Sequence, residues 1–342
     1  MIPFGILESS FRAAGLERWG LVGETALREA CASLSPALRS RLALDLAAGA
    51  AVVALPYGEG REAPVPALPA DEPLARIARF ARADWYAELS ARLKTVSALA
   101  RASLRGALGE QLGASAALRS LEAPGLAARD WRYFVNSRLP EKRLALEAGL
   151  GALGRNSLVL AKGAGSALVI GVLLLPIPVS APSAEPALGP RPGQRPEGPG
   201  ILRNATHSAR QPTLAESCVD CRACVEACPT GALRGEGGLD RELCLQHWSS
   251  ISGALPPAVE AAWGNRLYGC DVCQEACPLY APAKDAVTSR GRLGEGLSAA
   301  WILRSSEAEL RSALRGSALG MSWISVEALK RNAELVLRWA RR

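Results

Sequence analysis

The chain has 342 residues, of which 49% are hydrophobic and 21% charged, and its formal net charge at pH 7 is +7. This composition excludes a disordered or fibrous chain, and the length allows two or three domains with cores of their own. The positive charge comes mostly from scattered arginines, so it permits an acidic partner such as RNA without requiring one.

The apolar stretches of the chain do not predict a membrane protein. The longest run, residues 167–175, is too short to cross a bilayer and ends at Pro176. Charged side chains interrupt the first 23 residues, where a secretory signal needs an unbroken apolar stretch. We therefore expect a cytoplasmic protein that does not bind a membrane.

The first half of the chain mixes apolar residues at helical spacing with short apolar runs typical of strands. In chain order, these patterns predict helices at 8–14 and 24–34, a strand at 50–55, a long helix at 74–99, a strand at 131–136, a helix near 144–148 and a strand at 167–175. Such a mixture indicates an α/β domain over residues 1–176.

Residues 177–213 differ from the rest of the chain. They are dense in Pro, Gly, Ser and Ala and carry almost no bulky apolar side chains, so we interpret them as a flexible linker or surface insertion. A cysteine-rich segment follows over residues 214–282. Residues 283–342 predict a helical region, in which Ser306-x-x-Glu309 has the capping-box pattern and the last helix covers 326–341.

Cysteine usage carries most of the functional information. Eight of the nine cysteines lie within about sixty residues, from Cys218 to Cys277. In a cytosolic protein, such a dense group favours metal binding over disulfides. The ninth, Cys31, stands alone in a predicted helix and is interpreted as a small buried hydrophobic residue.

The spacing of the first cysteine motif points to iron–sulfur chemistry. Cys218-x2-Cys221-x2-Cys224-x3-Cys228-Pro229 is the bacterial ferredoxin pattern, in which the fourth cysteine ligates the other of two 4Fe–4S clusters. Two structural zinc sites are the alternative, because zinc also binds four thiolates. Zinc does not require this spacing, so the pattern favours iron.

The second motif, Cys270-x2-Cys273-x3-Cys277-Pro278, is one ligand short, because Leu267 occupies the remaining position. Cys244, from the intervening segment, can supply the missing thiolate. Each cluster then has four ligands: Cys218, Cys221, Cys224 and Cys277 for the first, and Cys228, Cys244, Cys270 and Cys273 for the second.

Two longer segments resemble the epoxyqueuosine reductase family. One is the cysteine block, including Gly264-NRLYGCDVCQEACP, and the other is Ala148-GLGALGRNSLVLAKGAGSALVIGVLLL. The resemblance covers most of the chain apart from 176–212. It implies an α+β protein with an N-terminal α/β cobalamin-binding domain related in fold to reductive dehalogenases, a ferredoxin-like domain with two 4Fe–4S clusters, and a C-terminal helical cap.

The resemblance also implies an activity and partners. In this family the clusters feed electrons to cobalamin, which removes the epoxide oxygen of epoxyqueuosine in the wobble position of tRNA to give queuosine. We therefore expect tRNA and an external electron donor such as flavodoxin or ferredoxin as partners, and a monomeric protein. Arg155, Lys162, Arg266 and the C-terminal arginines are candidates for tRNA phosphates, with solvated surface charge as the alternative.

Within this resemblance, the glycine-rich block is expected to bind the corrin, because small residues let the backbone approach a large ligand. The expected contacts are Leu153, Gly154, Asn156, Ser157, Gly163 and Ser166. His247 is expected near the cofactor or the second cluster, with an ordinary partly buried histidine as the alternative. The chain has no Asp-x-His-x-x-Gly motif and only one other histidine, His207, so a histidine ligand to cobalt is not expected.

One departure from the family concerns the proton donor. The family's proposed donor is an aspartate at the position of Asn136, and an amide has no proton to release near neutral pH. Asp130 and Glu141 are the acids nearby, and the segment 34–50 is also shorter than in the family. Three hypotheses remain: an epoxyqueuosine reductase with a substituted acid, a corrinoid and iron–sulfur paralogue with another substrate, and a non-catalytic two-cluster electron-transfer or binding protein.

Overall fold

A computed structural model describes residues 1–58, 72–112, 127–180, 214–284, 286, 288 and 290–342. The chain forms two compact units that interleave along the sequence. The first comprises Met1–Leu55, Leu89–Ala152 and Val169–Pro212, and the second comprises Pro56–Glu88, Leu153–Leu168 and Thr213–Arg342. These units do not follow the predicted boundary at residue 176. The linker predicted for 177–213, and His207 within it, lie almost entirely outside the described residues.

The first unit is built on a four-stranded sheet with the order β1-β2-β7-β4. The strands are β1 (Trp19–Gly23), β2 (Gly49–Pro56), β7 (Leu168–Leu175) and β4 (Tyr133–Val135). β1 is antiparallel to β2, and β4 is antiparallel to β7. The two central strands are buried along most of their length, which is why they read as continuous apolar runs. All three predicted strands are confirmed.

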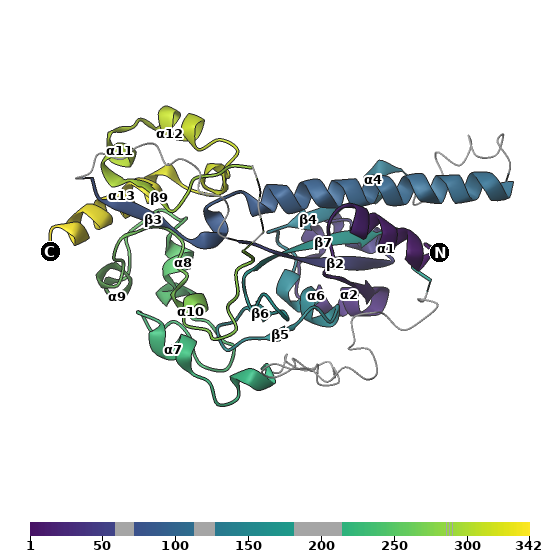
Figure 1. Ribbon diagram of the computed structural model, residues 1–342, viewed down its shortest axis with the longest axis horizontal. Helices are drawn as coiled ribbons and strands as arrows, with labels where there is room; N and C mark the ends of the chain where they lie inside the picture. Colours follow the sequence, from purple (N-terminus) through teal and green to yellow (C-terminus); the bar gives the residue numbers. More distant parts are fainter. Residues whose placement is uncertain (59–71, 113–126, 181–213, 285, 287, 289) are drawn as a thin grey trace. The chain divides into compact units, whose positions relative to one another are not determined.

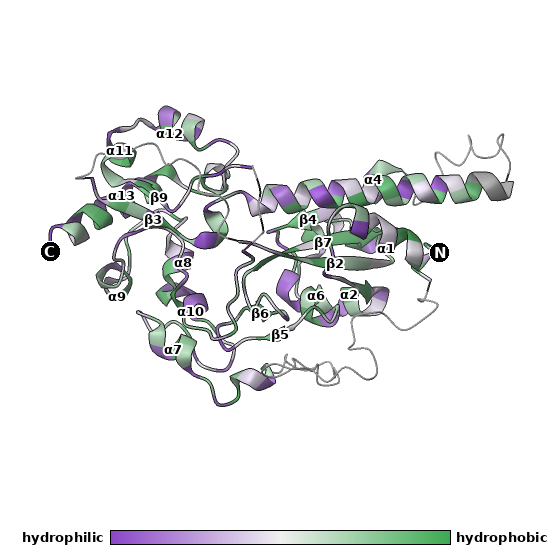
Figure 2. Ribbon diagram, viewed as in Figure 1, coloured by the Kyte–Doolittle hydropathy of each residue, from purple (hydrophilic) through white to green (hydrophobic). Residues whose placement is uncertain are grey.

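Helices cover both faces of this sheet (Figure 1). They are α1 (Phe4–Ala13), α2 (Glu24–Ala30), α4 (Trp85–Leu112) and α6 (Glu141–Glu147), and the short helix α3 (Pro36–Arg41), which has no buried residue, follows α2 in the chain. Along α4 hydrophobic and hydrophilic residues alternate (Figure 2), and its buried residues recur at helical spacing. Gly171 on β7 allows this packing, because a Cβ there would lie 2.9 Å from Leu89 and Leu93. No helix in the described ranges is both long and apolar enough to span a membrane.

The second unit contains a three-stranded sheet with the order β8-β3-β9, capped by helices. Its strands are β3 (Leu74–Ile77), β8 (Arg266–Tyr268) and β9 (Gly296–Ser298), and its capping helices are α11 (Ala299–Arg304), α12 (Glu307–Ala313) and α13 (Val326–Ala340). The predicted capping box at Ser306 and the predicted last helix are confirmed. These strands and helices share one hydrophobic core.

The helix predicted over 74–99 is wrong before Trp85. Residues 74–77 form β3, which pairs in parallel with β8 and antiparallel with β9. Both partners lie about two hundred residues away in the sequence, so their hydrogen bonds override the local helical pattern. Through this pairing, β3 joins the core of the C-terminal cap.

The cysteine-rich segment has short helices separated by turns. They are α7 (Ala223–Ala227), α8 (Leu245–Trp248), α9 (Pro257–Ala261) and α10 (Val272–Glu275). The glycine-rich block forms a two-stranded hairpin of β5 (Ala152–Leu153) and β6 (Val159–Leu160). Short helices and tight turns leave many backbone N–H groups available to the cysteine sulfurs.

Candidate functional site

The first group of thiols is assembled from both cysteine motifs. Burial raises the pKa of Cys224, and the neighbouring Cys218, Cys277 and Cys221 raise it further. The pKa of Cys277 is raised by burial and in the same way by Cys218 and Cys221. The structure thus brings together the four cysteines predicted to hold the first cluster, although their role as ligands stays a prediction.

The second group is assembled around Cys273. Burial raises the pKa of this thiol to about 12, and Cys270, Cys244 and Cys228 act in the same direction. Cys224 of the first group also contributes, so the two groups are neighbours. Cys244 is therefore placed with the cysteines whose set it was predicted to complete.

Cys228 sits in a different electrostatic environment. Burial acts to raise its pKa, but hydrogen bonds from the backbone of Thr230, Ala232 and Leu233 and from the Thr230 hydroxyl lower it overall. The Thr230 Oγ1 lies 3.7 Å from the sulfur. Hydrogen bonds to the sulfurs are one of the ways a protein sets the reduction potential of an iron–sulfur cluster.

The thiols that the structure describes do not form a single-metal site. In the described ranges, no three His, Cys, Asp or Glu side chains converge as ligands of one metal ion. In a 4Fe–4S cluster each thiolate binds a different iron, so four cysteines surround the cluster without converging on one atom. Two groups of four thiols, drawn from the two cysteine motifs and Cys244, are a donor set that fits two such clusters.

The structure explains why Leu267 occupies a position that a regular second motif would give to cysteine. Leu267 lies in β8 and is fully buried in the core of the C-terminal cap. The turn that follows is fixed by Gly269, whose φ is +83° and whose added Cβ would lie 2.3 Å from that of Ala78. Gln246 Oε1 accepts a hydrogen bond from the Cys270 backbone over 3.3 Å and so links the Cys244 segment to this turn.

The predicted corrin-binding residues lie in or near the β5–β6 hairpin. Asn156 and Ser166 are both buried, and Asn156 Nδ2 and Ser166 Oγ have no hydrogen-bond partner among the described residues. A buried polar atom without a partner costs about 1–3 kcal/mol, so such atoms indicate a missing ligand or water. These two residues fit a polar group of a bound cofactor.

The other residues of this block are explained by the packing of the chain itself. An added Cβ on Gly154 would lie 2.5 Å from Asn156 Oδ1, so the glycine allows the turn to close. Leu153 forms a bridge with Leu214 and packs near Gly237. Gly163 and Ser157 have positive φ values, 73° and 63°, as turn residues do. Contacts of these four with cobalamin stay predictions.

Asn136 directly follows β4, has a φ of +51° and is exposed. The Glu141 carboxylate holds the backbone beside it: Ser137 donates to Glu141 Oε1 through its N–H over 2.7 Å and its hydroxyl over 2.9 Å. Burial raises the pKa of Glu141, although these bonds and one from the Asn136 N–H act to lower it. Asp130 lies before β4, beside Arg129.

His247 lies on α8 near charged side chains. Its Nδ1 is 3.4 Å from Arg241 Nη2, and its Nε2 is 4.0 Å from Glu242 Oε1. Its ring meets that of Trp248 edge-on at 5.8 Å. These contacts match the alternative reading of an ordinary, partly buried histidine, and its expected contact with the cofactor or second cluster stays a prediction.

Two arginines proposed for tRNA phosphates are instead engaged by the backbone. Arg266 Nη1 donates to the carbonyls of Ala262 and Trp263, over 3.2 and 2.6 Å. Arg155 donates to the carbonyls of Cys218, Val219 and Gly235. Both therefore have structural partners that their position in the sequence did not reveal.

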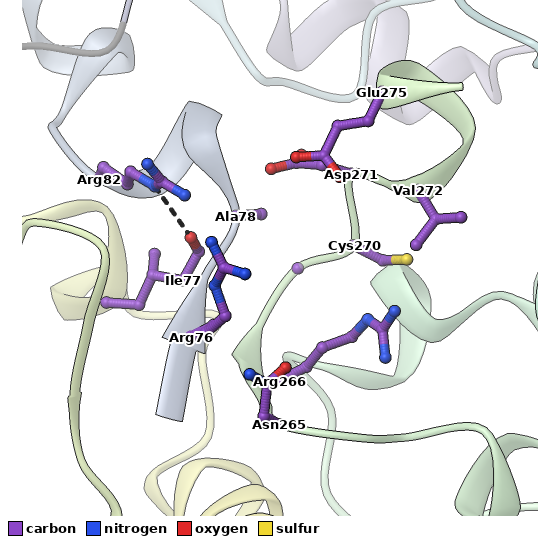
Figure 3. A pocket seen from close by; sticks show the side chains of 11 residues that line it. Arg76, Ile77, Ala78, Arg82, Asn265, Arg266, Cys270, Asp271, Val272 and Glu275 are labelled. Carbon is purple, nitrogen blue, oxygen red and sulfur yellow. Dashed lines mark hydrogen bonds between the residues drawn. The ribbon is translucent and has the colours of Figure 1, made fainter. Parts of the chain in front are cut away.

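A cavity of about 90 Å³ lies beside the second group of thiols. Figure 3 shows Cys270 on one wall, between Val272 and Arg266, with Arg76 and Arg82 on the opposite side. Arg82 donates to the Ile77 carbonyl over 3.2 Å and pairs with Glu295. This charged cavity lies next to a cysteine predicted to bind the second cluster.

Sequence reasoning missed Arg331 and Asn332 on α13. Asn332 is fully buried, and its Nδ2 donates to the carbonyls of Ser249 and Leu267. Arg331 donates to the carbonyls of Trp248, Ile251 and Gly253. An asparagine on the apolar face of a predicted helix was the available signal, because buried polar groups need partners.

Comparison with known proteins agrees with this geometry. The model of the 4Fe-4S double cluster binding domain matches residues 217–280. The epoxyqueuosine reductase of Shewanella oneidensis is 34% identical over 185 residues, which are 53% of this chain and 38% of that protein. The Escherichia coli epoxyqueuosine reductase is 34% identical over 151 residues, 44% of this chain and 32% of that one. The matches thus span less than half the length of these curated relatives.

Solved structures are similar over nearly the whole chain. The epoxyqueuosine reductase of Streptococcus thermophilus has a TM-score of 0.64 at 18% identity, covering 98% of this chain and 81% of its own. An epoxyqueuosine reductase crystallised with an epoxyqueuosine-modified tRNA stem loop gives the same TM-score at 20% identity, covering 98% and 80%. These similarities show the α+β fold.

Proposed function

Because the chain belongs to the epoxyqueuosine reductase family of oxidoreductases, we propose that it uses two 4Fe–4S clusters and cobalamin to reduce epoxyqueuosine to queuosine in tRNA. The observation that carries this proposal is the assembly of eight cysteines into two neighbouring groups of four, with Cys244 in the second. Each cluster carries one electron at a time, whereas removal of the epoxide oxygen as water consumes two electrons and two protons.

The clusters account for the electrons but not for the chemistry at the substrate. When bound, cobalamin supplies the two-electron chemistry at the epoxide. Among the residues proposed to hold it, Asn156 and Ser166 have the strongest support, because each has a buried polar atom without a partner in the described part of the chain. Leu153, Gly154, Ser157 and Gly163 complete the proposed surface.

The proton for the departing oxygen needs an acid other than Asn136. We assign this role to Glu141, because its carboxyl is hydrogen-bonded to the segment Asn136–Ser137 and because burial favours its protonated form. The Ser137 hydroxyl donates to the same oxygen, so it can pass a proton between the buried carboxyl and the exposed loop. Asn136 itself can only hydrogen-bond the substrate.

A paralogue acting on another substrate is the second candidate. The observation that favours it is Asn136 itself, which replaces the acid expected from the resemblance. A non-catalytic two-cluster electron-transfer or binding protein is the third. We propose tRNA and an external electron donor such as flavodoxin or ferredoxin as partners, and the monomeric state and cytoplasmic location stay predictions.

The three candidates differ in what the purified protein contains. Anaerobic purification with added cobalamin, followed by analysis of iron, acid-labile sulfide and corrinoid, is expected to give eight iron atoms and one corrinoid per chain on the basis of two four-iron clusters. Clusters without a corrinoid would favour the non-catalytic protein. A colourless protein holding zinc and no sulfide would refute the iron–sulfur assignment.

A further inference from the structure

Arg155 lies in the turn of the β5–β6 hairpin, and its guanidinium is surrounded by backbone carbonyls of the first-cluster segment. Nε donates to the Cys218 carbonyl over 3.0 Å, and Nη2 donates to the carbonyls of Cys218 and Val219 over 2.5 and 2.8 Å. Nη1 donates to the Gly235 carbonyl. One side chain therefore joins the hairpin to the chain on both sides of the first cysteine motif.

These contacts hold the charge without neutralising it. All four hydrogen bonds go to neutral carbonyl oxygens, and the guanidinium is always protonated in proteins. The residue is partly buried, so the charge is screened less than one in solvent. A positive charge is thus fixed against the peptide of Cys218, a proposed ligand of the first cluster.

We propose that Arg155 is a positioning residue that closes the first-cluster loop and raises the reduction potential of that cluster. Reduction adds one negative charge to a cluster already made anionic by four thiolates, so a nearby fixed cation stabilises the reduced form. The inference rests on the proposed presence of the clusters. It identifies a residue that sets the reduction potential of the first cluster relative to that of the second.

Arg222 provides a matched control for the charge. It lies between Cys221 and Cys224, and its guanidinium is 3.5 Å from the position of a Cβ added to Gly235, so it is close to the same loop. Arg222 is exposed, whereas Arg155 is partly buried. Solvent screens the exposed charge, so the same loss of charge at Arg222 should affect the cluster less.

The test is an anaerobic redox titration with dithionite, followed by electron paramagnetic resonance, on the full-length protein and on Arg155→Gln, Arg155→Lys and Arg222→Gln. In Arg155→Gln we expect one of the two clusters to show a tenfold lower ratio of reduced to oxidised form at a given potential, which is about 59 mV for a one-electron couple. Arg155→Lys keeps the charge and should shift much less, and so should Arg222→Gln.

Iron and sulfide analysis of each variant distinguishes a shifted reduction potential from the loss of a cluster. Arg155→Gln with full iron and an unchanged potential would overturn the proposal, as would an equal shift in Arg222→Gln. If Arg155→Gln loses a cluster, retention of both clusters at near wild-type potential in Arg155→Lys supports it. Loss of iron in both Arg155 variants means that the residue only holds the loop, which overturns the tuning claim. Absence of iron and sulfide from the wild-type protein refutes the proposed function itself, independently of any variant.

Discussion

Asn332 donates through Nδ2 to the carbonyl of Leu267 over 2.8 Å, and both residues are fully buried. The same nitrogen donates to the Ser249 carbonyl over 3.0 Å. Helix α13 thus holds β8 and the end of α8, the two segments that carry Cys270 and Cys244 into the second group of thiols. The C-terminal cap is therefore a support of the proposed second cluster.

Replacing Asn332 by leucine should destabilise this support. The variant leaves two buried carbonyls without their donor, each at a cost of about 1–3 kcal/mol, so we expect the free energy of unfolding to fall by about 2–6 kcal/mol. Anaerobic denaturant unfolding measures the change. Glu334→Gln, at an exposed position of the same helix, is the control and should change stability by less than about 0.5 kcal/mol. Equal stability of the two variants would contradict the role given to Asn332.

Removing Cys244 should remove the second cluster and leave the first. Cys244→Ala deletes one of four proposed ligands, so iron and sulfide per chain should fall to about half, because each cluster is held by its own four thiolates. Cys31→Ala is the control, since Cys31 is buried in the first unit and belongs to neither group of thiols, so the iron content should stay unchanged. Full iron content in Cys244→Ala would show that another residue completes the site.

A cysteine placed at the regular motif position should not rescue this loss. The Leu267 side chain is directed into the core of the cap, so a thiol there cannot reach the cluster without breaking the β3–β8 pairing. We expect Cys244→Ala/Leu267→Cys to hold no more iron than Cys244→Ala alone. Restored iron content would mean that the side chain at position 267 can leave the core and face the cluster.

Glu141 should make stability depend on pH. Burial raises its pKa in the folded chain, so the folded state binds this proton more tightly than the unfolded state. The stabilisation is complete below the ordinary carboxyl pKa of about 4.3 and is lost as the pH rises through the raised native pKa. The free energy of unfolding of the wild type minus that of Glu141→Gln should therefore decline over this window in denaturant titrations. A constant difference would contradict a raised pKa.

The same residue should control conversion of the substrate. If Glu141 is the acid, Glu141→Gln should slow conversion of epoxyqueuosine by about 10²–10⁴-fold, with iron and corrinoid content unchanged. Adding Asn136→Asp to that variant should restore part of the rate, because a carboxyl then occupies the position beside Ser137. If Asn136→Asp alone raises the rate of conversion and Glu141→Gln leaves it unchanged, the acid acts at position 136 and not at Glu141.

The sequence predicts the parts of this molecule that depend on local spacing. The cysteine motifs, the central strands and the capping box at Ser306 follow from short local patterns in the sequence. The structure brings the cysteines together in two groups and forms the strands and the capping box. It does not predict β3, whose strand form depends on pairing with β8 and β9 far along the chain. It also does not reveal the carbonyl partners of Arg155, because an arginine that binds carbonyls has the same local signal as one that binds phosphate.

Conversion of epoxyqueuosine to queuosine in a tRNA stem loop tests the central claim most directly. The anaerobic protein, loaded with cobalamin and supplied with reductant, should yield a nucleoside lighter by one oxygen atom in mass spectrometry, and the Cys244→Ala variant should not. An unchanged epoxide in the presence of both clusters and reducible bound cobalamin would contradict the account and assign the chain to a reductase of another substrate.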